Sequence, residues 1–206
     1  AFAGNGLLTG QPQVGQVIGQ AGTITGLTDQ TQVILLDRGF VNPVVIVQPP
    51  SYNGLEEVVV RVSDVQSDRF TIYLQEPSNR NGKHTTETVS YVVLEAGMWQ
   101  LPGGTLVEVG TVDTSATAGS QMAGAQFEAV SFANPFSTAP VVLSQIQTAN
   151  FNPLFVKTRQ DDTTSSGFQL ALDVEEVVTV PHGQETVGYL AIEAGAGSWG
   201  SIAFEA

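Results

Sequence analysis

The sequence predicts an all-β protein built as two tandem antiparallel six-stranded β-sandwich domains. Short runs rich in Val, Ile, Tyr and Phe recur at intervals of about 8–12 residues, as in sandwiches and barrels. Glycine and proline, 22 and 10 of the 206 residues, separate these runs. Two long segments also repeat each other, and no long stretch shows helical periodicity with caps.

The repeat sets the domain organisation. Residues 82–97 (GKHTTETVSYVVLEAG) align without a gap with residues 180–195 (VPHGQETVGYLAIEAG), at an offset of 98. We therefore expect one sandwich over residues 1–109 and a second over residues 110–206. The first has a longer N-terminal segment rich in Gly and Gln, Gly10–Gly26, which we interpret as an extra loop or edge segment.

Each unit contains a matching series of expected strands. In the first unit they are Val33–Leu36, Val44–Val47, Val58–Val62, Phe70–Leu74 and Val89–Leu94. In the second they are Val141–Ile146, Phe155–Arg159, Phe168–Leu172 and Val187–Ile192. Turn signals such as Asn53-Gly54 and Pro102-Gly103-Gly104 lie between them.

The last strand of the first unit is partly apolar on both faces. Val89, Tyr91 and Val93 share one face, and Val92 and Leu94 share the other. Such a strand is expected at the centre of a sheet, with its second face covered by the opposite sheet or by a neighbouring subunit. Trp99 and Trp199 each follow the last strand of a unit, which favours packing between the two domains.

Charge and cysteine content narrow the classes of function. Twenty acidic residues against seven basic ones give a net charge of −13, which argues against nucleic acid and anionic membrane surfaces as partners. No apolar run approaches the roughly 18–20 residues of a membrane helix, so no membrane insertion is expected. The absence of cysteine excludes disulfides and thiol nucleophiles. Charged residues are only 13% of the chain, which suits a secreted, extracellular or cell-surface protein.

The unit resembles a known family. Phe132-Ala133-Asn134-Pro135-Phe136, then Pro140-Val141-Val142, Gly167-Phe168, His182 and Gly188-Tyr189-Leu190-Ala191-Ile192 are similar to the H-type lectin domain. This six-stranded antiparallel sandwich occurs in snail agglutinins and slime-mould discoidins. The first unit shows Phe40, Pro43-Val44-Val45, Phe70, His84 and Ser90-Tyr91-Val92-Val93 at the same places. The resemblance implies glycan or polysaccharide partners and a trimeric state.

The resemblance also suggests ligand-binding residues. Such lectins bind galactosamine-type sugars through a mid-strand Arg, a His before the last strand and a nearby aromatic. The candidates at these positions, with the neighbouring glutamates and loop aromatics, are Arg61, His84, Glu87, Tyr52, Arg159, His182, Glu185 and Phe151. The sequence departs from the family where Lys83 and Pro181 precede each His in place of an aromatic, and where Tyr91 and Tyr189 stand in a position that more often holds Trp.

Each candidate also has a structural interpretation. A buried His–Glu hydrogen bond, pinning a loop to the last strand, carries more weight than a sugar or metal ligand. Arg61 and Arg159 are assigned equally to ligand binding and to ion pairs with Glu95 and Glu193. Tyr52 and Phe151 are interpreted as plugs over the sandwich ends slightly more than as stacking platforms.

No cofactor is expected, and the metal question stays open. Asp161-Asp162 and Glu175-Glu176 offer oxygens that calcium would accept, although paired acids on loops are more often solvated. No GxSxG, HExxH, P-loop or dinucleotide motif is present, so we expect no enzyme.

Two functions follow. The first is an extracellular non-catalytic carbohydrate-binding or adhesion module, whose two repeats raise affinity by avidity. The alternative is a structural repeat unit of a surface-layer, sheath or filament protein that self-associates head to tail. The start Ala1-Phe2-Ala3-Gly4, without Met, fits a processed product or a segment of a longer chain.

Overall fold

The computed structural model describes residues 6–10, 16–119, 124–150, 155–199 and 202–206. Its strands are β1 (Gly6–Gly10), β2 (Gln16–Leu27), β3 (Gln32–Leu35), β4 (Pro43–Val47), β5 (Val59–Gln66), β6 (Arg69–Gln75), β7 (Glu87–Glu95), β8 (Gly97–Gln100), β9 (Leu106–Thr114), β10 (Thr117–Ala118), β11 (Glu128–Ser131), β12 (Val141–Ile146), β13 (Val156–Asp161), β14 (Gly167–Val174), β15 (Glu185–Ile192), β16 (Ala196–Trp199) and β17 (Ile202–Glu205). The all-β prediction is confirmed. All pairings are antiparallel except the two-residue contact of β10 with β14.

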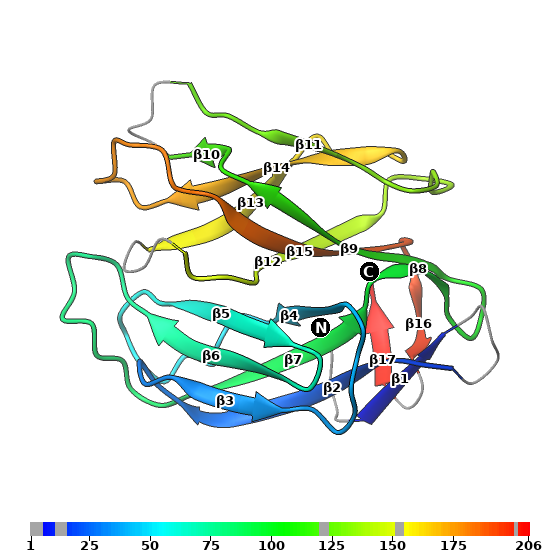
Figure 1. Ribbon diagram of the computed structural model, residues 1–206, viewed down its shortest axis with the longest axis horizontal. Helices are drawn as coiled ribbons and strands as arrows, with labels where there is room; N and C mark the ends of the chain where they lie inside the picture. The colour runs from blue at the N-terminus through cyan, green and yellow to red at the C-terminus, as the bar shows by residue number, and fades with distance from the viewer. Residues whose placement is uncertain (1–5, 11–15, 120–123, 151–154, 200–201) are drawn as a thin grey trace.

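Four sheets form two sandwiches stacked in four layers, and β16 and β17 form a separate two-stranded sheet (Figure 1). In the first sandwich, sheet β3-β6-β5 packs on sheet β1-β2-β7-β4. In the second, sheet β12-β15-β9-β8 packs on sheet β10-β14-β11, with β13 on β14. The sheets that contain β7 and β15 face each other in the middle of the stack. The boundary expected between residues 109 and 110 falls inside β9, whose whole length belongs to the second sandwich.

Every strand expected from the sequence is present within a few residues of its expected bounds. The extra loop or edge segment expected at the N-terminus is wrong for its described part from Gln16 onward. Those residues form β2, which lies between β1 and β7. Its glycines have a packing role, because a Cβ on Gly19 would lie 2.5 Å from Leu94 and one on Gly22 would lie 2.5 Å from the Tyr91 ring.

The two faces of β7 bury different cores. Val89, Tyr91 and Val93 point into the first sandwich, where the Phe70 and Tyr91 rings meet edge to face at 5.1 Å. Val92 and Leu94 point to the other side, into a core shared with the second sandwich. The expectation that the second face of this strand is covered is thereby met, and the covering element is the neighbouring repeat.

The shared core lies between the two central sheets. Its buried members come from both sandwiches and from the last hairpin: Leu8, Ile18, Ala21, Val44, Ile46, Val92, Leu94, Trp99, Leu101, Val107, Val109, Leu190, Ile192, Trp199 and Phe204. Both tryptophans belong to it, which confirms their expected role in packing the domains together. The indole N–H of Trp99 donates to the carbonyl of Glu95 at 2.8 Å, so its buried polar group is satisfied.

Candidate functional site

The two repeated glutamates fasten a loop in each sandwich. Glu87 accepts hydrogen bonds from the hydroxyl of Ser51 at 2.5 Å and from the backbone N–H groups of Asn53 at 3.0 Å and Gly54 at 2.8 Å. In the second sandwich Glu185 accepts from the Thr148 hydroxyl and from the Asn150 N–H. Both carboxylates are buried. They therefore tie the loop after β4 or β12 to the last strand.

The hydrogen bonds at Glu87 also set its ionisation. Burial alone would raise the pKa of this carboxyl. The bonds from Ser51, Gly54, Asn53 and His84 act in the opposite direction and outweigh it, so the pKa of Glu87 lies below its ordinary value. The carboxylate form is thus the one that the folded loop requires.

The two histidines are both buried but differ in their contacts. His84 lies between two glutamates, with Nδ1 3.1 Å from Glu76 and Nε2 3.2 Å from Glu87. The structural His–Glu hydrogen bond expected from the sequence is therefore present in the first sandwich. His182 places Nδ1 2.9 Å from the carbonyl of Gly183. The offset of 98 puts Val174 where the first sandwich has Glu76, so the flanking of a His by two acids belongs to the first repeat.

Arg61 and Arg159 occupy equivalent strands but different environments. Arg61 is 1% exposed and donates to the Gln75 side chain at 3.0 Å and to the carbonyl of Thr148, in the second sandwich, at 3.4 Å. Burial lowers the pKa of Arg61, while the nearby Tyr73 and Glu185 act to raise it. Glu95, one of its expected partners, instead accepts hydrogen bonds from Val41 N and Asn42 N.

Arg159 remains open to solvent on the outer sheet of the second sandwich. Its guanidinium carbon lies 5.9 Å from the centroid of the Phe127 ring. It lines a hollow of about 360 Å³ together with Phe155, Lys157 and Asp173. His182 is not among the described residues around this hollow, so the Arg–His pair implied by the lectin resemblance does not line it.

The two loop aromatics give one correction. Tyr52 is 79% exposed, so its expected role as a plug over the sandwich end is wrong. The loop of Tyr52 is instead held by hydrogen bonds from Ser51, Asn53 and Gly54 to Glu87, and the Tyr52 ring lies in solvent. Phe151 lies outside the described residues.

The joint between the sandwiches contains polar groups that the sequence did not single out. Gln147 is buried and accepts from Val45 N while donating to Val45 O, each at 2.8 Å. β4 is the last strand of its sheet, so this side chain satisfies one residue of an open sheet edge. In the sequence, the role of Gln147 could be suspected only from a difference between the repeats, because the first unit has Pro50 at the matching position.

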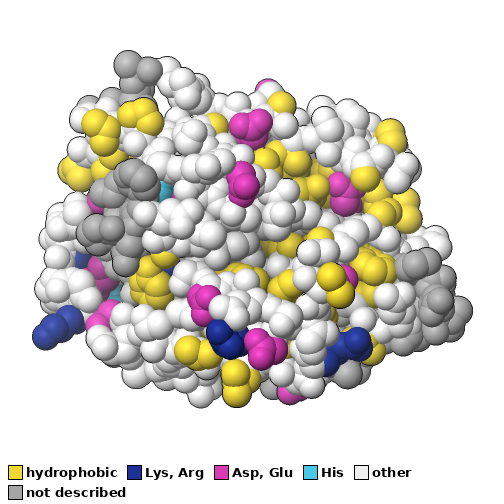
Figure 2. Space-filling model, in the orientation of Figure 1, with side chains coloured by type: hydrophobic (Ala, Val, Ile, Leu, Met, Phe, Trp, Pro, Cys, Tyr) yellow, Lys and Arg dark blue, Asp and Glu magenta, His cyan; other side chains and the backbone are white. Residues whose placement is uncertain are grey.

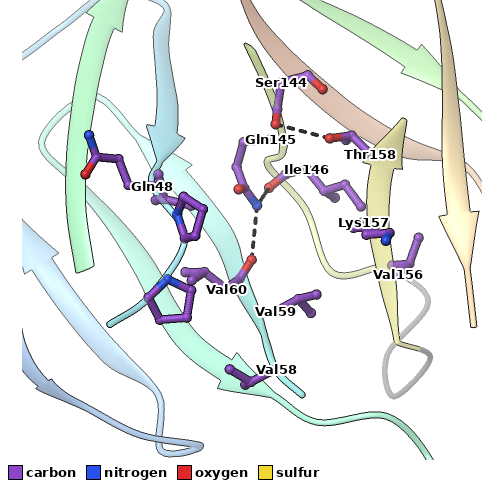
Figure 3. Close-up of a pocket in the computed structure, with 13 residues that line it drawn as sticks. Gln48, Val58, Val59, Val60, Ser144, Gln145, Ile146, Val156, Lys157 and Thr158 are labelled. Carbon is purple, nitrogen blue, oxygen red and sulfur yellow. Dashed lines mark hydrogen bonds between the residues drawn. The ribbon is translucent and has the colours of Figure 1, made fainter. Parts of the chain in front are cut away.

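A groove runs beside this joint (Figure 3). It has a volume of about 240 Å³ and is lined by valines of β5 and by residues of β12 and β13. Gln145 crosses it and donates to the carbonyl of Val60 at 3.3 Å, while the Thr158 hydroxyl donates to Ser144 O at 3.1 Å. The groove wall is thus held by hydrogen bonds both within the second sandwich and between the two.

The surface and the described acids give no further chemical site. Figure 2 shows Asp and Glu side chains spread over one face of the molecule, some among uncharged groups and some beside Lys or Arg. Within the described ranges, no three or more His, Asp or Glu side chains are grouped so as to hold a metal ion. The described part of the chain also lacks any helix long and apolar enough to cross a membrane.

Comparison with known proteins shows a similarity to part of a much longer protein. The chain is 33% identical over 192 residues to halomucin of Haloquadratum walsbyi. The match covers 88% of this chain and 2% of the length of halomucin. No family model matches the sequence, and no solved structure matches it.

Proposed function

We propose that this chain is a non-catalytic structural module of a cell-surface protein, in which two β-sandwich repeats are joined into one rigid pair. The observation that carries the proposal is the core shared by the two central sheets. A flexible pair of binding domains has no need of such a core, since interfaces between mobile domains are typically small and polar. The similarity to part of halomucin is consistent with a module of a surface protein.

The burial and the hydrogen bonds of the candidate ligand residues support the same proposal. Arg61, His84, Glu87 and Glu185 are buried, and their hydrogen bonds fasten loops and join the sandwiches. Reactive chemistry would need some of these groups to face a cleft. Their engagement in the fold supports a role without catalysis.

Calorimetry tests the rigid pair. Because both sandwiches share one core, the chain should unfold in a single transition whose van't Hoff enthalpy equals the calorimetric enthalpy. Two separate transitions, or a van't Hoff enthalpy near half of the calorimetric value, would overturn the proposal.

Carbohydrate binding is the second candidate, and it is supported by the open hollow at Arg159. That hollow combines the Arg159 guanidinium, the Lys157 ammonium, the carboxylates of Asp173, Glu175 and Glu176 and the ring of Phe155, and such groups hydrogen-bond to sugars and stack on them. A glycan array with the wild type and with Arg159→Ala provides the test. Loss of a specific signal in Arg159→Ala, with Arg69→Ala as a surface control that retains it, is the supporting result. Uniformly flat binding by the wild type would reject the candidate.

A further inference from the structure

Three hairpins among the described residues have a glycine at the same place, although the β1–β2 pair has a register shift between Leu8 and Thr9 that the other two lack. They are β1–β2, β8–β9 and β16–β17, and each contains a glycine with a large positive φ in or next to its first strand. These glycines are Gly6, Gly97 and Gly195, with φ of 153°, 142° and 146°. They lie opposite Ala21, Val109 and Ala206 in turn. Counted from these glycines, Phe204 and Glu205 of β17 correspond to Val107 and Glu108 of β9 and to Gly19 and Gln20 of β2.

The first two hairpins are completed by a third strand. The far edge of β2 pairs with β7, and the far edge of β9 pairs with β15. In each case this third strand is the last strand of a sandwich. Among the described strands, β17 pairs with β16 alone. Within the described residues, the edge that β7 or β15 covers in the other two hairpins is therefore open in β17.

The exposure of Glu205 is evidence for this open edge. It lies opposite Ala196, as Glu108 lies opposite Met98 in the β8–β9 hairpin. Glu108 is buried and accepts the hydroxyl of Tyr189 at 2.9 Å. Glu205, in the matching position, is exposed. The difference between the two glutamates is the tyrosine-bearing strand that covers Glu108.

The backbone hydrogen bonds of β17 also indicate an open edge. Ala206 and Gly195 exchange both of their hydrogen bonds, at 2.8 and 2.9 Å. In an antiparallel ladder alternate residues turn their N–H and C=O groups to opposite sides. The N–H and C=O of Glu205 are therefore directed at the open edge. An edge of this kind accepts an extended segment by main-chain pairing, with side-chain contacts giving the specificity.

We propose that the open edge of β17 is a docking site for the last strand of another repeat unit of this kind, a segment with the sequence pattern of β15. In the register of β9 with β15, Glu108 lies opposite Ala191. The docked strand places its matching alanine opposite Glu205 and its tyrosine hydroxyl on the Glu205 carboxylate. The source of the strand rests on the proposed structural role of the repeats, whereas the edge itself does not.

A synthetic peptide with the sequence of residues 183–195 (GQETVGYLAIEAG) tests the site on the full 206-residue chain. Titration followed by amide NMR should show saturable 1:1 binding and slower hydrogen exchange at Glu205. A scrambled peptide should leave the spectrum unchanged, and a peptide with Tyr189→Phe should bind more weakly. Absence of binding, or protection confined to other strands, would overturn the proposal.

Two variants of the chain sharpen the result. Glu205→Pro removes the edge N–H without removing a hydrogen bond to β16, so it should abolish peptide binding. Glu205→Gln keeps an acceptor oxygen at this position for the tyrosine hydroxyl and should retain binding. Equal binding by Glu205→Pro and wild type would refute the edge as the site. The single calorimetric transition tests the rigid pair separately, so a failure here leaves that proposal standing.

Discussion

Gly188 lies at the contact between the two sandwiches, where a larger side chain would disturb their docking. It lies in β15, and a Cβ built on it would lie 2.5 Å from Cγ1 of Val44 in β4. Val44 is fully buried, and a β-branched side chain has little freedom to rotate away. Gly188→Ala therefore forces the sheets apart. Overpacking of this kind costs about 1–3 kcal/mol, which corresponds to a fall in Tm of roughly 2–12 °C for a chain of this size.

Two companion variants isolate the cause. Ser90 is the matching residue in the first sandwich and already carries a Cβ, so Ser90→Ala should change the stability by no more than about 0.5 kcal/mol. Val44→Ala removes the clashing methyl, so the double variant should lose less stability than the sum of the single changes. Calorimetry measures all four proteins. A Gly188→Ala protein as stable as the wild type, with additive effects in the double variant, would refute the described docking.

The remaining predictions concern polar contacts, charge and the shared core. The pKa of Glu87 is lower in the folded protein than its ordinary value of 4.5. The contribution of Glu87 to stability is therefore present above pH 4.5 and is lost as the pH falls through the folded pKa. In a series of unfolding experiments at falling pH, the difference in stability between wild type and Glu87→Gln should become smaller. Tyr189→Phe loses a bond to a carboxylate and should cost about 1.5–3 kcal/mol, against about 0.5–1.5 for Tyr91→Phe, whose partner is an amide; equal losses in urea unfolding would contradict this. Trp199→Ala should cost about 3–5 kcal/mol, because the ring fills the shared core; a change below 1 kcal/mol in the same assay would place the ring elsewhere. With a net charge of −13, self-repulsion is screened by salt, and the Tm should rise between 0.05 and about 1 M NaCl; a flat or falling Tm would count against it.

The strands that sequence reasoning found are those with dense β-branched and aromatic residues. β4, β7, β12 and β15 are examples, and all four were placed within two residues of their ends. The strands β1, β2, β8 and β9 were missed, as were the short strands β10, β11, β16 and β17. β2 has glycine at positions 19 and 22 because the Leu94 and Tyr91 side chains of β7 pack over its backbone there. Its small residues are a consequence of tertiary packing, which composition alone reads as a loop.

The features of the candidate site were also predicted only in part from the sequence. The buried His–Glu hydrogen bond expected from the sequence is present in the first sandwich, whereas the backbone N–H groups that donate to Glu87 and Glu185 were not predicted. Arg61 and Arg159 could not be distinguished, because only the stacking of the sandwiches buries the first and leaves the second open. Gln147 was missed for the same reason: its partner, Val45, lies 102 residues away on the other repeat.

We propose that the two sandwiches move as one rigid body, docked through the sheets that contain β7 and β15. Residual dipolar couplings of backbone amides in a weakly aligned sample test it most directly. Amides from β2–β7 and from β9–β15 should fit a single alignment tensor with the relative orientation of the structure. Two tensors that differ in magnitude or direction would show that the sandwiches move independently and would contradict the account.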